Sequence, residues 1–586
     1  MLRILKRLKA AEWLQALISL VFVVSQVWLD LKLPDYMSEI TRLTQTSGSE
    51  MSDIWTAGGK MLLCALGSLV SAIIVGFFAS RIAASFSRRL RSDLFTKVDS
   101  FSMEEINRFS TASLITRSTN DITQVQLLIT MGLQIMIKAP ITAVWALTKI
   151  VGKGVEWSIA TGVAIAILLA MIVLIMLFVM PKFKKMQSLT DNLNRVVREN
   201  LTGLRVVRAY NAEHYQEEKF EAANNELTET QLYTNRGMAV MMPMMSTLMS
   251  GMSLAIYWIG AYLINGASAM DRLSLFSNMV VFSSYSVQVI MSFMMLLMIF
   301  VLWPRASVSA KRINEVLETK PTIFDGQVTN GKDDQEGEIA FRNVSFKYPG
   351  ASDYVLQNIS FTAKKGETVA FIGSTGSGKS TLISLVPRFY DVTDGNIFVD
   401  GINVKEYKQE SLHNKIGYVP QKAVMFRGTV SSNISYGDNG MTKPNEEDVR
   451  TAVRIAQGMD FVEAMEGGYA GEIAQSGSNV SGGQKQRLAI ARAICRKPEI
   501  YIFDDSFSAL DYKTDRILRS ELKKETAGVT SLIVAQRIGT IMDADQIIVL
   551  DEGKIVGKGT HKELLNSCDV YREIAMSQLS EEELIS

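Results

Sequence analysis

One glycine-rich segment of this 586-residue chain has the residue types and the spacing that hold the phosphates of a nucleotide. The segment Gly373–Ser380 follows an apolar stretch, 367–372, and precedes a helix-forming stretch, 381–385. The pattern G-x-x-x-x-G-K-S between a strand and a helix is that of a P-loop. Its glycines let backbone N–H groups surround the phosphates, and the helix N-terminus adds a partial positive charge. We therefore predict an ATP site formed by Gly373, Ser374, Thr375, Gly376, Ser377, Gly378, Lys379, Ser380 and Thr381.

A second segment supplies the acidic group that a P-loop needs for its metal ion. The apolar stretch Ile500–Asp504 predicts a buried strand that ends in a carboxylate. In P-loop enzymes the lysine contacts the β- and γ-phosphates, while the serine and this aspartate hold Mg²⁺. We expect Lys379, Ser380 and Asp504 in these roles, with ATP and Mg²⁺ as cofactors.

The N-terminal half has a different composition and predicts a membrane domain. A helix needs about 20 mostly apolar residues to cross a bilayer. Six stretches meet this requirement: Trp13–Leu33, Ile54–Ser80, Thr130–Val151, Val155–Met180, Met238–Ile264 and Leu275–Trp303. Residues 320–586 instead alternate apolar and charged residues, as soluble domains do.

Basic residues are distributed unevenly around these spans. Lys and Arg are frequent before the first span and in the segments 81–129 and 181–237, whereas the alternate loops are poor in them. The positive-inside tendency predicts a multi-pass protein of the cell (plasma or inner) membrane with both termini and the ATPase domain in the cytoplasm. Both basic segments keep a helical apolar period, so we expect long cytoplasmic helix extensions; solvated linkers are the alternative. Each hairpin would end in a short transverse helix, at Ser102–Phe109 and at Arg208–Tyr215.

The last two spans are rich in methionine, whose flexible thioether suits a cavity that accepts varied apolar shapes. Packing against lipid or against other helices is the alternative for any single methionine. This composition favours a small amphipathic substrate, either drug-like or lipid-like, and a lipid bilayer as surroundings. Lys138, in the third span, is expected to face an aqueous cavity or to extend toward the cytoplasmic edge.

Net charge and cysteine content argue against a nucleic-acid partner, a disulfide framework and a zinc site. The net charge is +1, so no global field favours nucleic acid as a partner. Three cysteines, far apart in the sequence, are too few for a disulfide framework or a zinc site.

Further motifs carry a family resemblance. Val480–Gln484, between the P-loop and Asp504, resembles the signature of ATP-binding-cassette (ABC) proteins. Tyr348 matches the adenine-stacking aromatic residue of that family, Gln421 the glutamine that contacts the metal, and Asp511 the aspartate of the D-loop. With six predicted spans ahead of these motifs, the chain resembles an ABC exporter half-transporter from end to end.

The resemblance implies a fold and an assembly. The fold is a membrane α-helical domain, with six transmembrane helices and long cytoplasmic extensions, fused to an α/β P-loop ATPase domain. We expect the transmembrane domain over 1–320, a linker over 321–337 and the nucleotide-binding domain over 338–586. In the family each ATP lies between the Walker motifs of one half and the signature of the other. The signature residues that would serve a partner's ATP are Ser481, Gly482, Gly483 and Gln484.

Two catalytic positions depart from the family pattern. After Asp504 the family has a glutamate that orients or deprotonates the attacking water, and this chain has Asp505. One methylene fewer sets the carboxylate back by more than about 1 Å, a misplacement that costs on the order of a hundredfold in rate. Gln536 replaces the switch histidine; it can hydrogen-bond to a γ-phosphate but carries no positive charge. Gln475 also stands where many exporters have glutamate.

These departures predict a site that binds Mg-ATP but hydrolyses it poorly, beside an intact signature. The pattern resembles the degenerate subunit of a heterodimeric bacterial multidrug-type exporter, whose partner half-transporter carries the glutamate and the histidine. The alternatives are a slow homodimeric exporter and an ATP-gated regulatory membrane protein that does not pump. A protein exporter that also cuts a leader peptide would need an N-terminal cysteine-protease domain, and the first span follows Met1 too closely to leave room for one.

Overall fold

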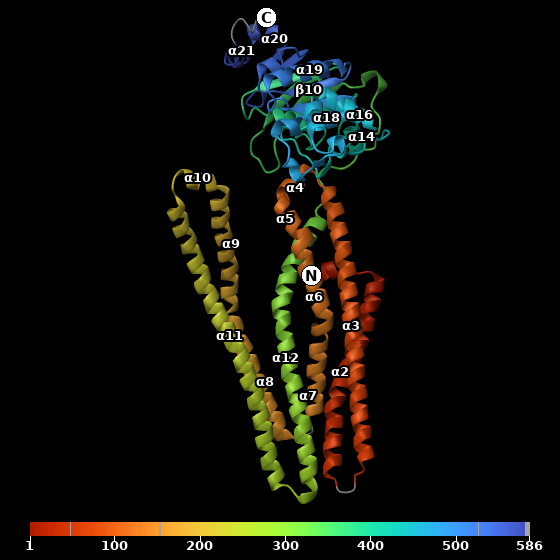
Figure 1. Ribbon diagram of the computed structural model, residues 1–586, viewed down its shortest axis with the longest axis vertical. Coiled ribbons are helices and arrows are strands. Elements are labelled where there is room, and N and C mark those ends of the chain that lie inside the picture. The colour runs from red at the N-terminus through yellow and green to blue at the C-terminus, as the bar shows by residue number, and fades with distance from the viewer. Residues whose placement is uncertain (47–48, 152–153, 526, 580–586) are drawn as a thin grey trace. The chain divides into compact units, whose positions relative to one another are not determined.

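Residues 1–46, 49–151, 154–525 and 527–579 are described by a computed structural model (Figure 1). The chain divides into two units. The first comprises Met1–Val98 and Ala112–Thr319, and the second comprises Asp99–Thr111 and Lys320–Ser586. A helical unit joined to an α/β unit confirms the predicted fold class. The domain boundaries drawn from the sequence stay predictions.

The first unit is made of helices, several of them long. They are α1 (Leu2–Leu5), α2 (Ala10–Gln45), α3 (Met51–Asp99), α5 (Thr111–Thr116), α6 (Ile122–Met131), α7 (Lys138–Ile150), α8 (Val155–Phe178), α9 (Met180–Thr202), α10 (Leu204–Ala209), α11 (Glu213–Gly266) and α12 (Ala269–Glu318). Two π-helical segments, Arg117–Asp121 and Gly132–Met136, interrupt the helix that runs from α5 to α7.

Within the described residues, six helical stretches are long and apolar enough to cross a membrane, which agrees with the six predicted spans. They are Ala10–Gln45, Met51–Asp99, Thr111–Ile150, Val155–Ile175, Glu213–Gly266 and Asp271–Leu296. Between 11% and 44% of the residues in the most apolar window of each stretch are buried within the chain, as expected where lipid or another subunit covers a helix.

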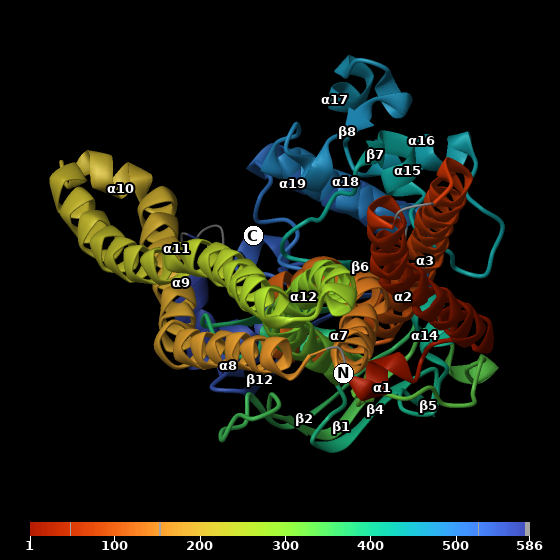
Figure 2. The ribbon, with the colours of Figure 1, turned by 90° about the horizontal axis from the view of Figure 1, so that it is seen from below.

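The hairpin of α9 and α11 ends in the short helix α10, which lies between their tips (Figures 1 and 2). This helix spans Leu204–Ala209, so the prediction of a transverse helix at Arg208–Tyr215 is wrong. Gly203 caps the end of α9, and α10 begins at the next residue, Leu204. Asn211 takes a left-handed backbone conformation with φ 49°, which turns the chain before α11 begins. The first transverse helix, in contrast, agrees with its predicted range: α4 (Met103–Phe109) follows the cap residue Ser102.

Two ion pairs connect membrane helices of the first unit. Lys138 on α7 lies 3.1 Å from Asp30 on α2, a partner that the sequence analysis did not assign. Lys149 on α7 lies 2.9 Å from Asp35 on α2, and the hydroxyl of Tyr285 on α12 donates to Asp35 at 2.7 Å. Charged groups in such segments are costly unless they are paired. The pairs therefore hold α2, α7 and α12 against one another.

The second unit contains α4 and the α/β fold. Its strands are β1 (Ile339–Phe346), β2 (Leu356–Ala363), β3 (Thr368–Gly373), β4 (Asp394–Val399), β5 (Ile402–Asn403), β6 (Ile416–Val419), β7 (Gly428–Thr429), β8 (Glu472–Ile473), β9 (Ile500–Asp504), β10 (Thr530–Val534), β11 (Gln546–Asp551) and β12 (Lys554–Gly559). Its other α-helices are α13 (Lys379–Ser384), α14 (Gln409–Asn414), α15 (Val430–Ile434), α16 (Glu446–Ile455), α17 (Met459–Ala464), α18 (Gly482–Cys495), α19 (Tyr512–Glu525), α20 (His561–Ser567) and α21 (Asp569–Met576).

A six-stranded sheet in the order β12-β11-β3-β10-β9-β6 forms the centre of this unit. All neighbouring pairs from β11 to β6 are parallel, and only β12 joins antiparallel. Alternate residues serve opposite faces: on β9, Tyr501 and Phe503 enter one core cluster and Ile500 and Ile502 the other. Both faces are covered, so these strands are continuously apolar, as parallel strands usually are. The antiparallel sheet β2-β1-β4-β5 lies along one side of the unit (Figure 2).

Candidate nucleotide-binding site

Four neighbouring strands bring the predicted catalytic residues to one edge of the sheet. The strands are β3, β10, β9 and β6, in that order and all parallel. The P-loop follows β3, Gln536 comes two residues after β10, Asp504 ends β9, and Gln421 comes two residues after β6. Since the carboxyl ends of parallel strands meet at one edge, residues more than 160 positions apart in sequence form one site.

The P-loop has the backbone that a phosphate cradle requires. Gly373 has φ 153°, and a Cβ there would lie 1.9 Å from the carbonyl oxygen of Leu550, so no side chain fits. Gly378 has φ 96° and precedes α13, whose first residue is Lys379. The Nζ atom of Lys379 donates to the carbonyl oxygens of Gly373 at 2.9 Å and Ser374 at 2.8 Å. The ammonium group therefore lies within the loop itself, where a phosphate would exchange for these carbonyls.

Burial lowers the pKa of Lys379, while the nearby carboxylates of Asp505 and Asp504 raise it. For Asp504 the effect of burial is the opposite: it raises the pKa of this carboxyl group, and the negative charge of Asp505 raises it further. The hydrogen bond from Ser380 and the charge of Lys379 act in the opposite direction on Asp504. Perturbed groups of opposite charge in one cleft are typical of functional sites.

Ser380 and Asp504 are directly connected. The hydroxyl of Ser380 donates to Oδ1 of Asp504 at 2.7 Å. Among the described residues no group of three or more His, Cys, Asp or Glu side chains could hold a metal ion by itself. Mg²⁺ normally binds through one or two protein oxygens together with substrate phosphates, so a serine–aspartate pair beside a P-loop fits it well.

Asp505 is bound by two amide side chains. Nε2 of Gln536 donates to its Oδ2 at 2.7 Å, and Nε2 of Gln421 donates to the same atom at 3.3 Å. Asp505 is 7% exposed and has φ 46°, and its backbone N–H bonds to Val534 on β10. The three residues that the sequence analysis assigned to water activation and metal contact thus lie together. An amide hydrogen-bonded to a carboxylate cannot relay a proton as an imidazole can.

Tyr348 lies beside the P-loop helix. Its hydroxyl is 3.0 Å from the hydroxyl of Thr381. Its ring meets those of Phe346 and Tyr390 edge-on, with centroids 5.0 and 5.3 Å apart. Tyr348 is 37% exposed, so one part of the ring stays accessible to a base.

The signature residues start α18. The hydroxyl of Ser481 accepts from the N–H of Gln484, and Oε1 of Gln484 accepts from the N–H of Ser481, a reciprocal cap. A Cβ at Gly482 would meet nothing within 4 Å, whereas one at Gly483 would lie 3.3 Å from the carbonyl oxygen of Ala509. The helix start therefore presents an open face with backbone N–H groups.

Two further predicted positions lie near the signature. Asp511 accepts from the N–H of Thr514 at 3.0 Å and so begins α19, and that hydrogen bond lowers its pKa. Gln475 lies in the short 3-10 segment Gln475–Gly477 before the signature.

Sequence reasoning missed the residues that tie α4 to the α/β fold. Glu105 accepts from the N–H of Thr322 at 3.0 Å and caps its own helix through Ser102. Asn107 donates to the hydroxyl of Tyr390 at 2.9 Å. Because Tyr390 packs on Tyr348, α4 is two contacts away from the proposed adenine platform. Only the capping pattern of Ser102 and Glu105 could have been seen in the sequence.

Comparison with known proteins identifies the family. The family model described as 'ABC transporter transmembrane region' matches residues 16–293, and the family model described as 'ABC transporter' matches residues 356–508. An uncharacterized ABC transporter ATP-binding protein of Mycobacterium tuberculosis is 41% identical over 523 residues, which cover 89% of this chain and 87% of the relative. The chain belongs to the ABC transporter family.

Other relatives of this ABC transporter extend the comparison. The ABC transporter ATP-binding protein YfiB of Bacillus subtilis is 34% identical, with 96% of each chain covered. The ATP-dependent lipid A-core flippase of Pseudomonas fluorescens is 31% identical, with 88% of this chain and 84% of the relative covered. The solved structure of a bacterial Atm1-family ABC exporter with ATP bound covers 98% of this chain and 99% of its own, with a TM-score of 0.75 and 23% identity. That likeness concerns the fold.

This ABC transporter is therefore a half-transporter: one chain joins a multi-pass transmembrane region to one ABC domain, and that domain implies ATP binding.

Proposed function

We propose that this ABC transporter is the degenerate-site subunit of a heterodimeric exporter. Its own Walker site would hold ATP and hydrolyse it poorly, while its signature would complete the active site of a partner half-transporter. The observation that carries this proposal is the 2.7 Å hydrogen bond from Gln536 to Asp505.

That bond joins the two catalytic positions, Asp505 and Gln536, that depart from the family pattern. The shortened carboxylate is held by Gln536 and Gln421, so its Oδ2 atom is already occupied by amide donors. A general base must lie within hydrogen-bond reach of the proton that it removes. Hydrolysis is slowed for two separate reasons. The two amides must first be displaced from Asp505, and its side chain, one methylene shorter than glutamate, must then reach the water.

The remaining site residues have roles in binding. The P-loop N–H groups and Lys379 would hold the phosphates, and Tyr348 would stack on the base. Ser380, Asp504 and Gln421 would hold Mg²⁺, which neutralises phosphate charge when it is bound. Ser481, Gly482 and Gly483 would contact the γ-phosphate at the partner's site, since a helix N-terminus with free N–H groups attracts anions.

The helix tip at α10 supports the need for a second subunit. Leu204, Val206 and Tyr210 are 43%, 60% and 79% exposed there. Leu201 on the adjacent turn is 65% exposed. Apolar groups gathered at a hairpin tip outside the apolar stretches that are predicted to span the membrane indicate a protein partner. We assign that partner as the other half-transporter, with its ATPase domain against this tip.

The cycle follows from these assignments. ATP at both interfaces draws two ATPase domains together because each nucleotide binds the closed pair better than the open one. The tips at α4 and α10 transmit this closure to the membrane helices, which open outward. Hydrolysis at the partner's Walker site then releases that interface, while ATP at this chain's site keeps the domains in contact.

The substrate and the location follow from the membrane half. The methionine-rich α11 and α12 support a small amphipathic substrate, and one relative is named as a lipid A-core flippase. The distribution of Lys and Arg supports the cell membrane, with the ATPase domain and both termini in the cytoplasm.

The decisive experiment isolates the full chain from its own membrane through an affinity tag. A second half-transporter should co-purify in equal amount. The assembled pair should hydrolyse ATP, and Asp505→Glu combined with Gln536→His in this chain should raise that rate. The matched control is Lys365→Met, an exposed residue outside the site, which should leave the rate unchanged. If this chain alone transports substrate with turnover of about 10 per second, an ordinary enzyme rate, the proposal is wrong.

A further inference from the structure

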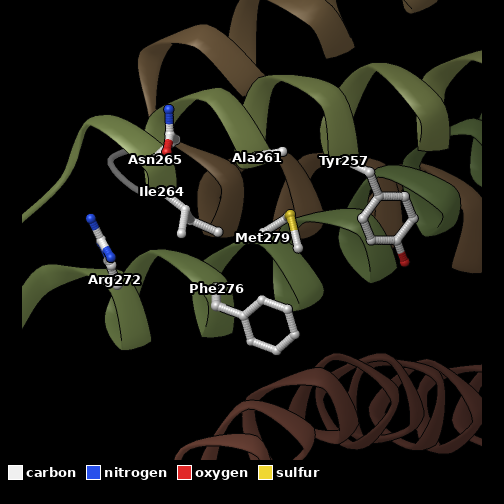
Figure 3. A pocket seen from close by; sticks show the side chains of 7 residues that line it. All are labelled: Tyr257, Ala261, Ile264, Asn265, Arg272, Phe276 and Met279. Carbon is white, nitrogen blue, oxygen red and sulfur yellow. The ribbon is translucent and has the colours of Figure 1, made fainter. Parts of the chain in front are cut away.

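A cavity of about 400 Å³ lies between α11 and α12, in the half of the hairpin next to the connecting loop. Its lining residues are Tyr257, Ala261, Ile264, Asn265, Arg272, Phe276 and Met279 (Figure 3). The volume lies within the usual range for small-molecule pockets, roughly 300–1,000 Å³. The nucleotide mechanism uses none of these residues.

The lining is divided by polarity along the helices. Asn265 and Arg272 lie at the loop end, while Ile264, Met279 and Phe276 line the part between the helices, and Tyr257 lies at the far end (Figure 3). Asn265 lies eight positions after Tyr257 on α11, which corresponds to a rise of about 12 Å. One leaflet of a bilayer contributes roughly 15 Å of hydrocarbon, so the apolar part matches most of an acyl chain in depth.

Arg272 is positioned to bind an anion. Its Nε atom donates to the carbonyl oxygen of Ala267 at 3.2 Å, which orients the guanidinium group. Within the described residues, its two terminal nitrogens donate no hydrogen bond. A guanidinium fork binds phosphate and carboxylate through two parallel hydrogen bonds. The adjacent Asp271 accepts instead from the hydroxyl of Ser268 at 2.6 Å.

We propose that this pocket binds an anionic lipid of the bilayer, with the phosphate on Arg272 and an acyl chain along Ile264, Met279 and Phe276. The seven lining residues include one cation and no carboxylate. An apolar helix of another subunit would leave that cation without a counter-ion, and a soluble anion would leave the apolar part exposed to water. An anionic lipid provides a counter-ion for Arg272 and covers the apolar part of the pocket with its acyl chain. On the proposed orientation, the pocket lies in the leaflet that faces away from the ATPase domain. The inference does not depend on whether the nucleotide site is degenerate.

The test uses the full chain in phosphatidylcholine nanodiscs that contain a trace of lipid with a photoactivatable acyl chain. Phosphatidylglycerol and phosphatidylcholine probes are compared, and labelled peptides are identified by mass spectrometry. We expect the anionic probe to label the segment 257–279 about fivefold more than the neutral probe, as one charge-assisted hydrogen-bonded contact at a wet edge would produce. Arg272→Gln should remove that preference, and Arg272→Lys should keep part of it. Ala261→Phe should reduce labelling by both probes because it fills the pocket.

The matched control is Lys60→Gln, a change at an exposed cation on α3 near the same end of the membrane helices. It should leave labelling unchanged, and ATP affinity should be the same in all variants, which shows that they fold. Equal labelling by the two probes, or labelling unaffected by Arg272→Gln, would overturn the proposal. Displacement of the probe by soluble glycerol phosphate would also contradict it, because the head group alone would then be the ligand.

Discussion

Gln536 donates a 2.7 Å hydrogen bond from Nε2 to Oδ2 of Asp505, joining the loop after β10 to the end of β9. Asp505 is 7% exposed, and Gln421 is its other amide donor, at 3.3 Å. The two residues that depart from the family's catalytic pattern are therefore bonded to each other. The effects on stability of substituting these two residues should therefore depend on each other.

Gln536→Ala should destabilise the ATPase unit by about 1–3 kcal/mol, because a buried carboxylate loses its nearest donor. Asp505→Ala should cost a similar amount. The double variant should cost clearly less than the sum of the two, since the pair is removed together. Denaturant unfolding of the four members of this cycle gives the coupling, and strict additivity would show that the bond contributes nothing.

Lys138→Met should destabilise the membrane unit because it leaves Asp30 charged beside an apolar side chain. Oδ1 of Asp30 still accepts from Ser68 at 2.5 Å, but its counter-ion is gone. Side chains of this pair are 23% and 28% exposed, so we expect about 1–3 kcal/mol, less than for a fully buried pair. Thermal unfolding in nanodiscs measures the effect. Lys138→Met with Asp30→Asn should recover most of it, and failure to recover would mean that packing, not charge, is responsible.

Glu105→Ala should loosen α4. Glu105 is 3% exposed and accepts from Ser102 and from the N–H of Thr322. Burial by itself would raise its pKa, but these hydrogen bonds lower it overall, so the carboxylate form is the one that holds the helix. Loss of the cap and of the Thr322 contact should speed amide exchange of residues 99–111 about tenfold or more.

The matched control for α4 is Glu104→Ala, on the same helix turn. It should change exchange of residues 99–111 little, because Ser102 and Glu105 form the capping box of α4. If both variants speed exchange equally, the cap at Glu105 is not what orders α4.

His413 should make the ATPase unit sensitive to mild acid. Burial lowers its pKa below the ordinary value of 6.5, and the charge of Arg496 adds to this, while the hydrogen bond to Pro387 opposes it. Below about pH 6.5 the unfolded chain binds a proton that the folded chain still excludes, so stability falls as the pH falls toward the folded pKa. The slope should be at most about 1.4 kcal/mol per pH unit.

His413→Gln should remove that slope, since the amide can still donate to the carbonyl oxygen of Pro387. Hydrogen exchange of peptides that contain β6, measured between pH 7 and 5, provides the readout. His214→Gln, at a side chain that is 84% exposed, is the control and should leave the slope unchanged.

The features that depend on neighbours along the chain could be predicted from the sequence. Hydropathy over about 20 residues is enough to place a membrane span, and all six spans were found because lipid acts on each helix separately. The P-loop and the aspartate that ends β9 could be predicted because their sequence spacing is local, and their roles stay predictions. Ser102 and Glu105 are three residues apart, and so α4 was predicted at its observed place.

Only the tertiary structure decided which distant residues meet. The pairing of Lys138 with Asp30, of Glu105 with Thr322 and of Gln536 with Asp505 joins segments separated by 108, 217 and 31 residues. Such contacts depend on strand order and helix packing, which no local pattern encodes. The start of α10 was misplaced for the same kind of reason: Gly203 and Asn211 set the turn through backbone angles. The amino-acid sequence by itself thus predicts the membrane spans and the phosphate loop. The hydrogen bond from Gln536 to Asp505, in contrast, exists only because β9 and β10 lie side by side.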